Sequence, residues 1–218
     1  MTLVRIDASI QGPRSASSAL ADLVQSEYTA AHPDVPVVSR HLGEQPLPSD
    51  AWAAAISGSF ADPSSHTPEQ TAGVSLAREL ATELSSADAV ILALPLYNWG
   101  VSQHVKAWID LAIAGAAHGT RLLDGTPVVL LATRGGAYGP GTPKEGWDHS
   151  IDYLRRILAE VWSADLTVIE RELTLVGVNP ALDALADLGA AAKVSAEQAA
   201  VAAGRELARR TRREADAA

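Results

Sequence analysis

The sequence predicts an α/β fold in which five parallel strands form a doubly wound sheet with helices on both faces. Two strand-length segments, 89–94 and 127–133, are continuously apolar, as strands buried on both faces are. Strand-type and helix-type segments alternate along the chain, which is typical of a parallel sheet. The 218 residues include no low-complexity linker, so we expect a single domain spanning residues 1–218.

Each expected element has its own local signal. The expected strands are 3–9, 35–42, 89–94, 127–133 and 166–171. Three helices are expected to begin at Ser15–Ser18, at Thr67 and at Ser102. Three more are expected over 51–56, over 147–162 and from 183 to the C-terminus. Thr67 is followed by Pro68 and by Gln70, a capping-box pattern, and Ser195 with Gln198 is a second candidate. Ser102 is expected as a helix N-cap.

The strand order decides which loops meet. In the order 2-1-3-4-5, the first and third strands are neighbours across the switch point, where ligands bind beyond the carboxyl ends of the strands. The loops that follow strands one, three and four then lie at one edge. The sequence therefore predicts one site built from three separate loops.

The loop after the third strand carries two aromatic side chains, Tyr97 and Trp99, on either side of the Asn98 amide. Pro95 is expected to end the strand, and Gly100 is expected to let the chain turn away. Leu96, Tyr97, Asn98 and Trp99 would then be held over the crevice. This grouping suits a flat heteroaromatic ligand with hydrogen-bonding edges.

The other two loops offer polar and backbone groups. Serines follow the first strand at the start of a helix, where hydroxyls, N–H groups and the positive helix end favour phosphate; the alternative is that these serines only cap the helix. Thr133 ends the fourth strand and opens into a glycine-rich loop, 134–141, where backbone can approach a ligand closely.

Composition removes several classes of function. A formal charge of −9 argues against a nucleic-acid partner, and the absence of cysteine means that redox chemistry needs a cofactor. The usual nucleotide motifs are missing and the histidines are scattered, so no metal site is predicted. No apolar run has membrane-spanning length, and we expect a cytoplasmic protein. A hydrolase with Ser102 as nucleophile is disfavoured because Ser102 does not directly follow the strand.

Three segments in this order carry a family resemblance. Ser9 with Ser15-Ala16-Ser17, then Pro95-Leu96-Tyr97-Asn98-Trp99, then Thr133-Arg134-Gly135-Gly136 resemble the FMN-dependent NADH-azoreductase and NAD(P)H quinone reductase family of flavodoxin-like proteins. The resemblance implies that the serines hold the FMN phosphate, that Leu96 to Trp99 lie along the isoalloxazine ring, and that Thr133 to Gly136 lie near its pyrimidine side.

The resemblance also implies a reaction. NADH or NADPH would give a hydride to the flavin, which would pass the electrons to a quinone-type or azo-type acceptor. Asn98 and Tyr138 would be the catalytic side chains. It implies a homodimer with active sites at the interface, for which the 43–66 segment and the helix after Gly100 are candidate contacts. A flavodoxin-like electron carrier is one alternative. A specialised biosynthetic reduction is another, suggested by Glu160 and Trp162.

Overall fold

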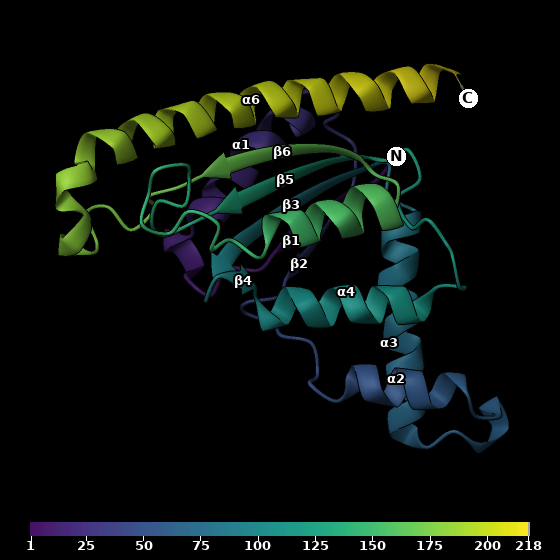
Figure 1. Ribbon diagram of the computed structural model, residues 1–218. Helices are drawn as coiled ribbons and strands as arrows, with labels where there is room; N and C mark the ends of the chain where they lie inside the picture. The colour runs from purple at the N-terminus through teal and green to yellow at the C-terminus, as the bar shows by residue number, and fades with distance from the viewer. Residues whose placement is uncertain (218) are drawn as a thin grey trace.

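The computed structural model describes residues 1–217, and its elements alternate as predicted (Figure 1). The strands are β1 Leu3–Asp7, β2 Val37–His41, β3 Ala89–Tyr97, β4 Gly100–Val101, β5 Pro127–Thr133 and β6 Asp165–Arg171. The helices are α1 Ala16–Ala31, α2 Ala51–Ser59, α3 Pro68–Ser85, α4 Gln103–Gly115, α5 Ile151–Arg155 and α6 Ala186–Ala217, with shorter turns η1 Gly12–Arg14, η2 Pro63–Ser65, η3 Arg156–Val161 and η4 Pro180–Leu185. Within this part of the chain, no helix combines the length and the apolar character needed to cross a membrane.

The five long strands are parallel and lie in the order β2-β1-β3-β5-β6. This is the predicted order 2-1-3-4-5, because β4 is a two-residue strand that pairs only with the end of β3. The predicted fold class is therefore confirmed, with β4 as an addition. The loops after β1, β3 and β5 leave the same edge of the sheet, as the order requires.

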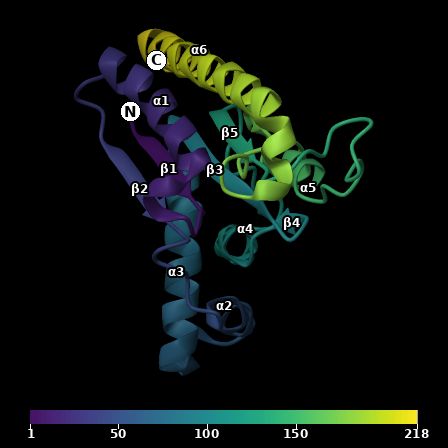
Figure 2. The same cartoon turned by 90° about the vertical axis from the view of Figure 1, so that its left-hand side faces the viewer.

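The core has two halves, one on each face of the sheet (Figure 2). Helices α1 and α6 cover one face, where buried side chains such as Leu20 and Leu207 meet the strands. Helices α3, α4 and α5 cover the other, and α2 packs against α3 and α4. On that side the buried indoles of Trp108 and Trp162 meet edge to face, with ring centroids 5.6 Å apart. Both faces of β3 and β5 are thus removed from water, which explains their unbroken apolar sequences.

Three of the predicted helix caps are confirmed. The Ser15 hydroxyl accepts a hydrogen bond from the Ser18 amide at 3.1 Å and begins α1. Thr67 and Gln70 form the full capping box of α3. The Ser102 hydroxyl accepts from the Val105 amide at 3.2 Å and begins α4. Each cap satisfies an amide that the helix itself leaves free.

Two helix predictions were wrong in extent. The helix expected over 147–162 begins only at Ile151, because the Asp148 carboxylate accepts from the amides of Ser150 and Ile151, and it continues as the π-helical η3. The second capping box is also wrong, since Ser195 lies inside α6, which begins at Ala186 after η4.

The turn after β3 differs from the prediction. Pro95 pairs with Thr133 of β5 and does not end the strand; the register with β1 has already ended at Ala93, so a residue without an N–H is tolerated there. The turn lies at Asn98 and Trp99, with φ of 48° and 64°, and not at Gly100. Positive φ at both central residues is the mark of a type I′ hairpin turn, and here it joins β3 to β4.

Candidate functional site

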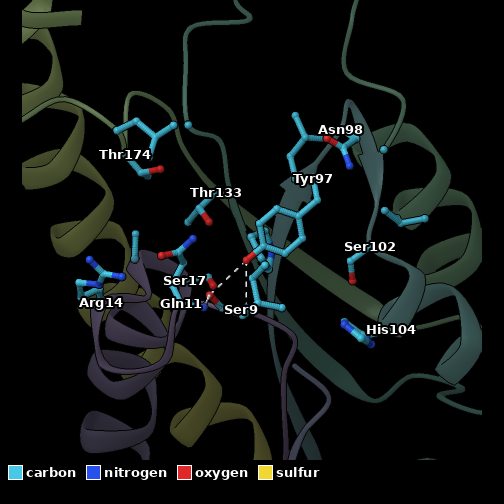
Figure 3. A pocket seen from close by; sticks show the side chains of 18 of the residues that line it. Ser9, Gln11, Arg14, Ser17, Tyr97, Asn98, Ser102, His104, Thr133 and Thr174 are labelled. Atoms are coloured by element: carbon cyan, nitrogen blue, oxygen red, sulfur yellow. Dashed lines mark hydrogen bonds between the residues drawn. The ribbon is translucent and has the colours of Figure 1, made fainter. Parts of the chain in front are cut away.

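A cavity of about 820 Å³ opens at the carboxyl edge of the sheet (Figure 3). It is lined by the loops after β1, β3, β5 and β6 and by the start of α4: Ser9, Ile10, Gln11, Arg14, Ala16, Ser17, Pro95, Leu96, Tyr97, Asn98, Gly100, Val101, Ser102, Gln103, His104, Thr133, Gly135, Thr174, Leu175 and Val178. The three loops that the sequence singled out therefore meet in one place, and a fourth joins them. The volume is in the range of sites for small organic ligands.

One end of the cavity consists of hydrogen-bond donors. Ser9 and Ser17 are almost fully buried, and both line the cavity beside Gln11 and Arg14. The α1 N-terminus points its first amides at the same end, and its cap, Ser15, takes up the amide of Ser18. Hydroxyls, free helix amides and a guanidinium together suit a phosphate group.

Tyr97 crosses the middle of the cavity. Its hydroxyl accepts a hydrogen bond from the Ile10 amide at 3.1 Å and lies 3.4 Å from the Ser9 hydroxyl. Figure 3 places the Tyr97 ring between the side that carries Ser17 and Thr133 and the side that carries Ser102 and His104. The ring therefore ties the β3 hairpin to the β1 loop.

The β3 hairpin and the loop after β5 form the other end of the cavity. Pro95, Leu96 and Asn98 contribute from the hairpin, and Thr133 and Gly135 contribute from the loop after β5. Asn98 holds a positive φ, so its amide is fixed at the tip of a tight hairpin and not on a mobile loop. Apolar side chains, backbone edges and one amide together suit a planar heteroaromatic ring.

The charge of the lining is opposite to that of the whole chain. The formal net charge is −9, yet no Asp or Glu is among the residues that line the cavity, while Arg14 and His104 are. An anionic ligand therefore meets no like charge inside it. This distribution is the strongest electrostatic feature of the site.

Arg134 does not line the cavity, although it belongs to the predicted site. Its guanidinium, 7% exposed, forms a short ion pair with Asp148, a second with Glu170 at 2.6 Å and a longer one with Glu172 at 3.5 Å. Burial alone would lower the pKa of Arg134, but hydrogen bonds and charge from Asp148 and Glu170 outweigh burial and raise the pKa. Within the chain the Arg134 side chain is paired with these carboxylates, so its predicted place beside a ligand stays a prediction.

Four further predicted site residues also lie outside the lining. Ser15 is used as the α1 cap, and Gly136 accepts from the Leu173 amide. The Trp99 ring packs edge to face against Trp147, with centroids 5.8 Å apart, and is 45% exposed. Tyr138 is held by the Lys144 ammonium 5.4 Å from its ring centroid.

Glu160 and Trp162, which suggested a specialised substrate, lie away from the cavity lining. Glu160 is exposed on η3 and pairs with Arg156 at 3.4 Å. Trp162 is a core residue against Trp108. Within the chain, neither side chain shapes the predicted pocket.

Sequence reasoning missed the lining residues in β4 and at the start of α4, and two further groups. Gln11 and Arg14 sit in the same loop as the recognised serines, and Arg14 is the one cation of that loop. Thr174, Leu175 and Val178 follow the last strand. The signal for this second group was topological, since a loop after a fifth parallel strand leaves at the same edge as the others.

Gly43 shapes the site although it does not line it. A Cβ atom at Gly43 would lie 2.2 Å from the Ser9 carbonyl oxygen, too close for any side chain. Gly43→Ala should therefore push the β1 loop out of position and lower the free energy of unfolding by about 1–3 kcal/mol, the usual cost of overpacking. Urea unfolding measures this loss, and the same variant should bind FMN more weakly.

Gly139→Ala is the matched control. The nearest atom to a Cβ at Gly139 is 4.0 Å away, and its φ is not positive, so this change should alter neither quantity. Equal effects of the two substitutions would contradict the close contact between Gly43 and Ser9.

Comparisons with known proteins agree with this geometry. The family model described as the flavodoxin-like fold matches residues 1–191. An FMN-dependent NADH:quinone oxidoreductase of Frankia alni is 40% identical over 202 residues, covering 90% of this chain and 95% of the relative. A protein of the same name from Streptomyces avermitilis is 38% identical over 213 residues, covering 96% and 98%.

A solved structure has the same fold. The azoreductase of Bacillus anthracis superposes with a TM-score of 0.74 at 20% identity, covering 94% of this chain and all of that one. At this identity the likeness concerns the fold alone, whereas the two relatives are similar in sequence over nearly their whole length. The chain therefore belongs to the family of flavodoxin-like proteins that includes the FMN-dependent NADH:quinone oxidoreductases.

Proposed function

We propose that this chain is an FMN-dependent oxidoreductase that passes reducing equivalents from NADH to quinones, with azo compounds as a second acceptor class. The observation that carries the proposal is the cavity itself. It has a donor-rich end beside the α1 N-terminus, it has Pro95, Leu96 and Asn98 at the β3 hairpin, and it has no carboxylate in the lining. The names of the relatives in this family supply the electron donor and the acceptor.

The donor set fits FMN. Ser9, Gln11, Ser17 and Arg14 would hold the phosphate, together with the first amides of α1, because these groups are all hydrogen-bond donors to an anion. The buried hydroxyls of Ser9 and Ser17 favour the phosphomonoester over an uncharged flavin. At the other end, Pro95 to Asn98, Thr133 and Gly135 would hold the ring system.

Bound FMN would supply the two-electron relay that the protein's own side chains lack. Overall, NADH and one proton convert a quinone to a hydroquinone and leave NAD⁺, so one hydride and one solvent proton reach the acceptor. The chain contributes position: the Asn98 amide, fixed by its hairpin turn, offers a hydrogen bond to the ring edge. Tyr97 keeps that hairpin against the phosphate loop through its hydroxyl. Such positioning is what flavin chemistry asks of a protein.

Anaerobic mixing of the FMN-loaded protein with NADH tests the proposal. We expect rapid loss of the flavin absorbance and its full return after a quinone is added. An electron carrier would bind FMN but would not be reduced rapidly by NADH. Protein that is colourless and takes up no added FMN would overturn the proposal. Glu160 and Trp162, which suggested a specialised biosynthetic reduction, lie away from the lining within one chain, so the cavity itself favours the quinone reductase.

A homodimer is part of the proposal. Trp52 and Ile113 are 49% and 44% exposed on α2 and α4, and Phe60, at the end of α2, is 87% exposed. Figure 1 shows these two helices on the same side of the sheet. Exposed apolar side chains of this size favour burial against a second copy, with the active sites near the interface. Light scattering should give a mass of two 22.7 kDa chains.

Two further expectations belong to the same proposal. The chain would act as a single domain of residues 1–218, since two hydrophobic clusters cover the two faces of one sheet. It would work in the cytoplasm, because a chain without cysteines does not depend on the oxidising compartments in which disulfides form.

A further inference from the structure

The loop after β6 gives the cavity an apolar wall. Leu175 and Val178 line the cavity and are 41% and 71% exposed. We call these two residues the aliphatic wall. Aliphatic side chains left this exposed in a ligand cavity indicate contact with an apolar group.

Hydrogen bonds to the loop after β5 hold the loop that carries the aliphatic wall in place. The amide and hydroxyl of Thr174 both donate to the Arg134 carbonyl at 3.1 Å, and the Leu175 amide donates to the Gly135 carbonyl at 3.1 Å. Leu173 takes a φ of 59°, which a leucine adopts only where surrounding contacts impose it. The loop is thus fixed to the loop after β5, and Figure 3 places Thr174 on the same side of Tyr97 as Thr133.

Gly135 explains how close the wall lies to the predicted ring site. A Cβ atom at position 135 would be 2.7 Å from Cδ1 of Leu175, so the leucine lies directly against this glycine. The Val178 amide donates to the Leu175 carbonyl at 3.0 Å and closes the turn that carries both side chains. An acceptor ring near Gly135 would therefore have aliphatic side chains within reach of its substituents.

Because the wall is aliphatic and uncharged, it favours one kind of ligand of the proposed reaction over the others. The diphosphate of NADH gains nothing from two uncharged aliphatic side chains, whereas a hydrocarbon substituent gains along its whole length. Resting on the proposed function, we propose that the aliphatic wall seats the hydrocarbon chain of an alkyl-substituted quinone, so that such quinones are preferred acceptors over the same ring without the chain.

Two quinones with one ring test this assignment: 2,3-dimethoxy-5-methylbenzoquinone and its 6-decyl derivative, with saturating NADH. In the unmodified protein, kcat/KM should be roughly tenfold higher for the decyl derivative, as contacts of a few methylenes provide. Leu175→Ser and Val178→Ser should each remove a large part of that preference and leave the shorter quinone unaffected. FMN affinity and flavin reduction by NADH should not change.

Val194→Ser is the matched control, since Val194 is 52% exposed on α6 and lies away from the cavity lining. Absence of a preference in the unmodified protein, or equal losses with both quinones, would overturn the assignment. A fall in FMN affinity would instead assign the wall to the flavin, which also overturns it. Quenching of tryptophan fluorescence by the two quinones measures binding without turnover, so the wall is tested even if NADH fails to reduce the protein.

Discussion

Replacing Gln11 with glutamate should weaken FMN binding by roughly fivefold to several hundredfold. Two like charges about 4 Å apart repel by about 1 kcal/mol in bulk water and by about 4 kcal/mol near a protein surface, and each 1.4 kcal/mol changes the affinity about tenfold. Gln11 is an exposed residue of the donor-rich end, and the substitution changes charge without changing shape. The new carboxylate would also compete with the phosphate for Arg14. Quenching of flavin fluorescence during a titration of cofactor-free protein measures the loss.

Gln103→Glu is the control for this prediction. Gln103 lines the same cavity but is the first residue of α4, next to Ser102, which Figure 3 places across the Tyr97 ring from Ser17. Like Gln11, it is exposed. A carboxylate there lies at a helix N-terminus and is not expected to disturb the fold. If Gln103→Glu weakens FMN binding as much as Gln11→Glu does, the phosphate end has been assigned to the wrong side of the cavity.

Arg134→Met should lower the free energy of unfolding by about 3–5 kcal/mol, the cost of removing one partner from a buried ion pair. Arg134 is 7% exposed, and its loss leaves Asp148 and Glu170 without their shared cation. Asp148 also begins α5 through the amides of Ser150 and Ile151, so the damage should reach that helix. Urea unfolding followed by circular dichroism measures the change.

Arg155→Met is the comparison that isolates burial. Arg155 contacts the same Glu170 at 3.5 Å, but its side chain is 49% exposed. Pairs of this kind contribute about 0–1 kcal/mol. If the two methionine variants are equally stable, Arg134 does not hold the loops together, and its role as a flavin ligand would have to be considered again.

The parts of the fold that the sequence predicts are those with local signals. Thr67 and Gln70 are three residues apart and form their capping box without help from the rest of the chain. The apolar segments of β3 and β5 require burial on both faces, and the alternation of elements then limits the strand order. This is why three loops could be assigned to one site before any contact was known.

The parts that escaped prediction depend on distant neighbours. The guanidinium of Arg134 is drawn to Asp148, Glu170 and Glu172, which are 14 to 38 residues away in sequence, so no local pattern shows that it turns from the cavity. The hairpin turn was misplaced because Asn98 is followed by Trp99 and not by glycine, the usual second residue of a type I′ turn. The sheet register imposes this conformation on Trp99.

The electron density of crystals saturated with FMN tests the central claim most directly. We expect the phosphate beside Ser9, Gln11 and Ser17 at the α1 N-terminus, and the ring against the hairpin residues 96–98. Density for the flavin in another hollow, such as the groove between α1 and α6 lined by Leu23 and Arg205, would contradict the account.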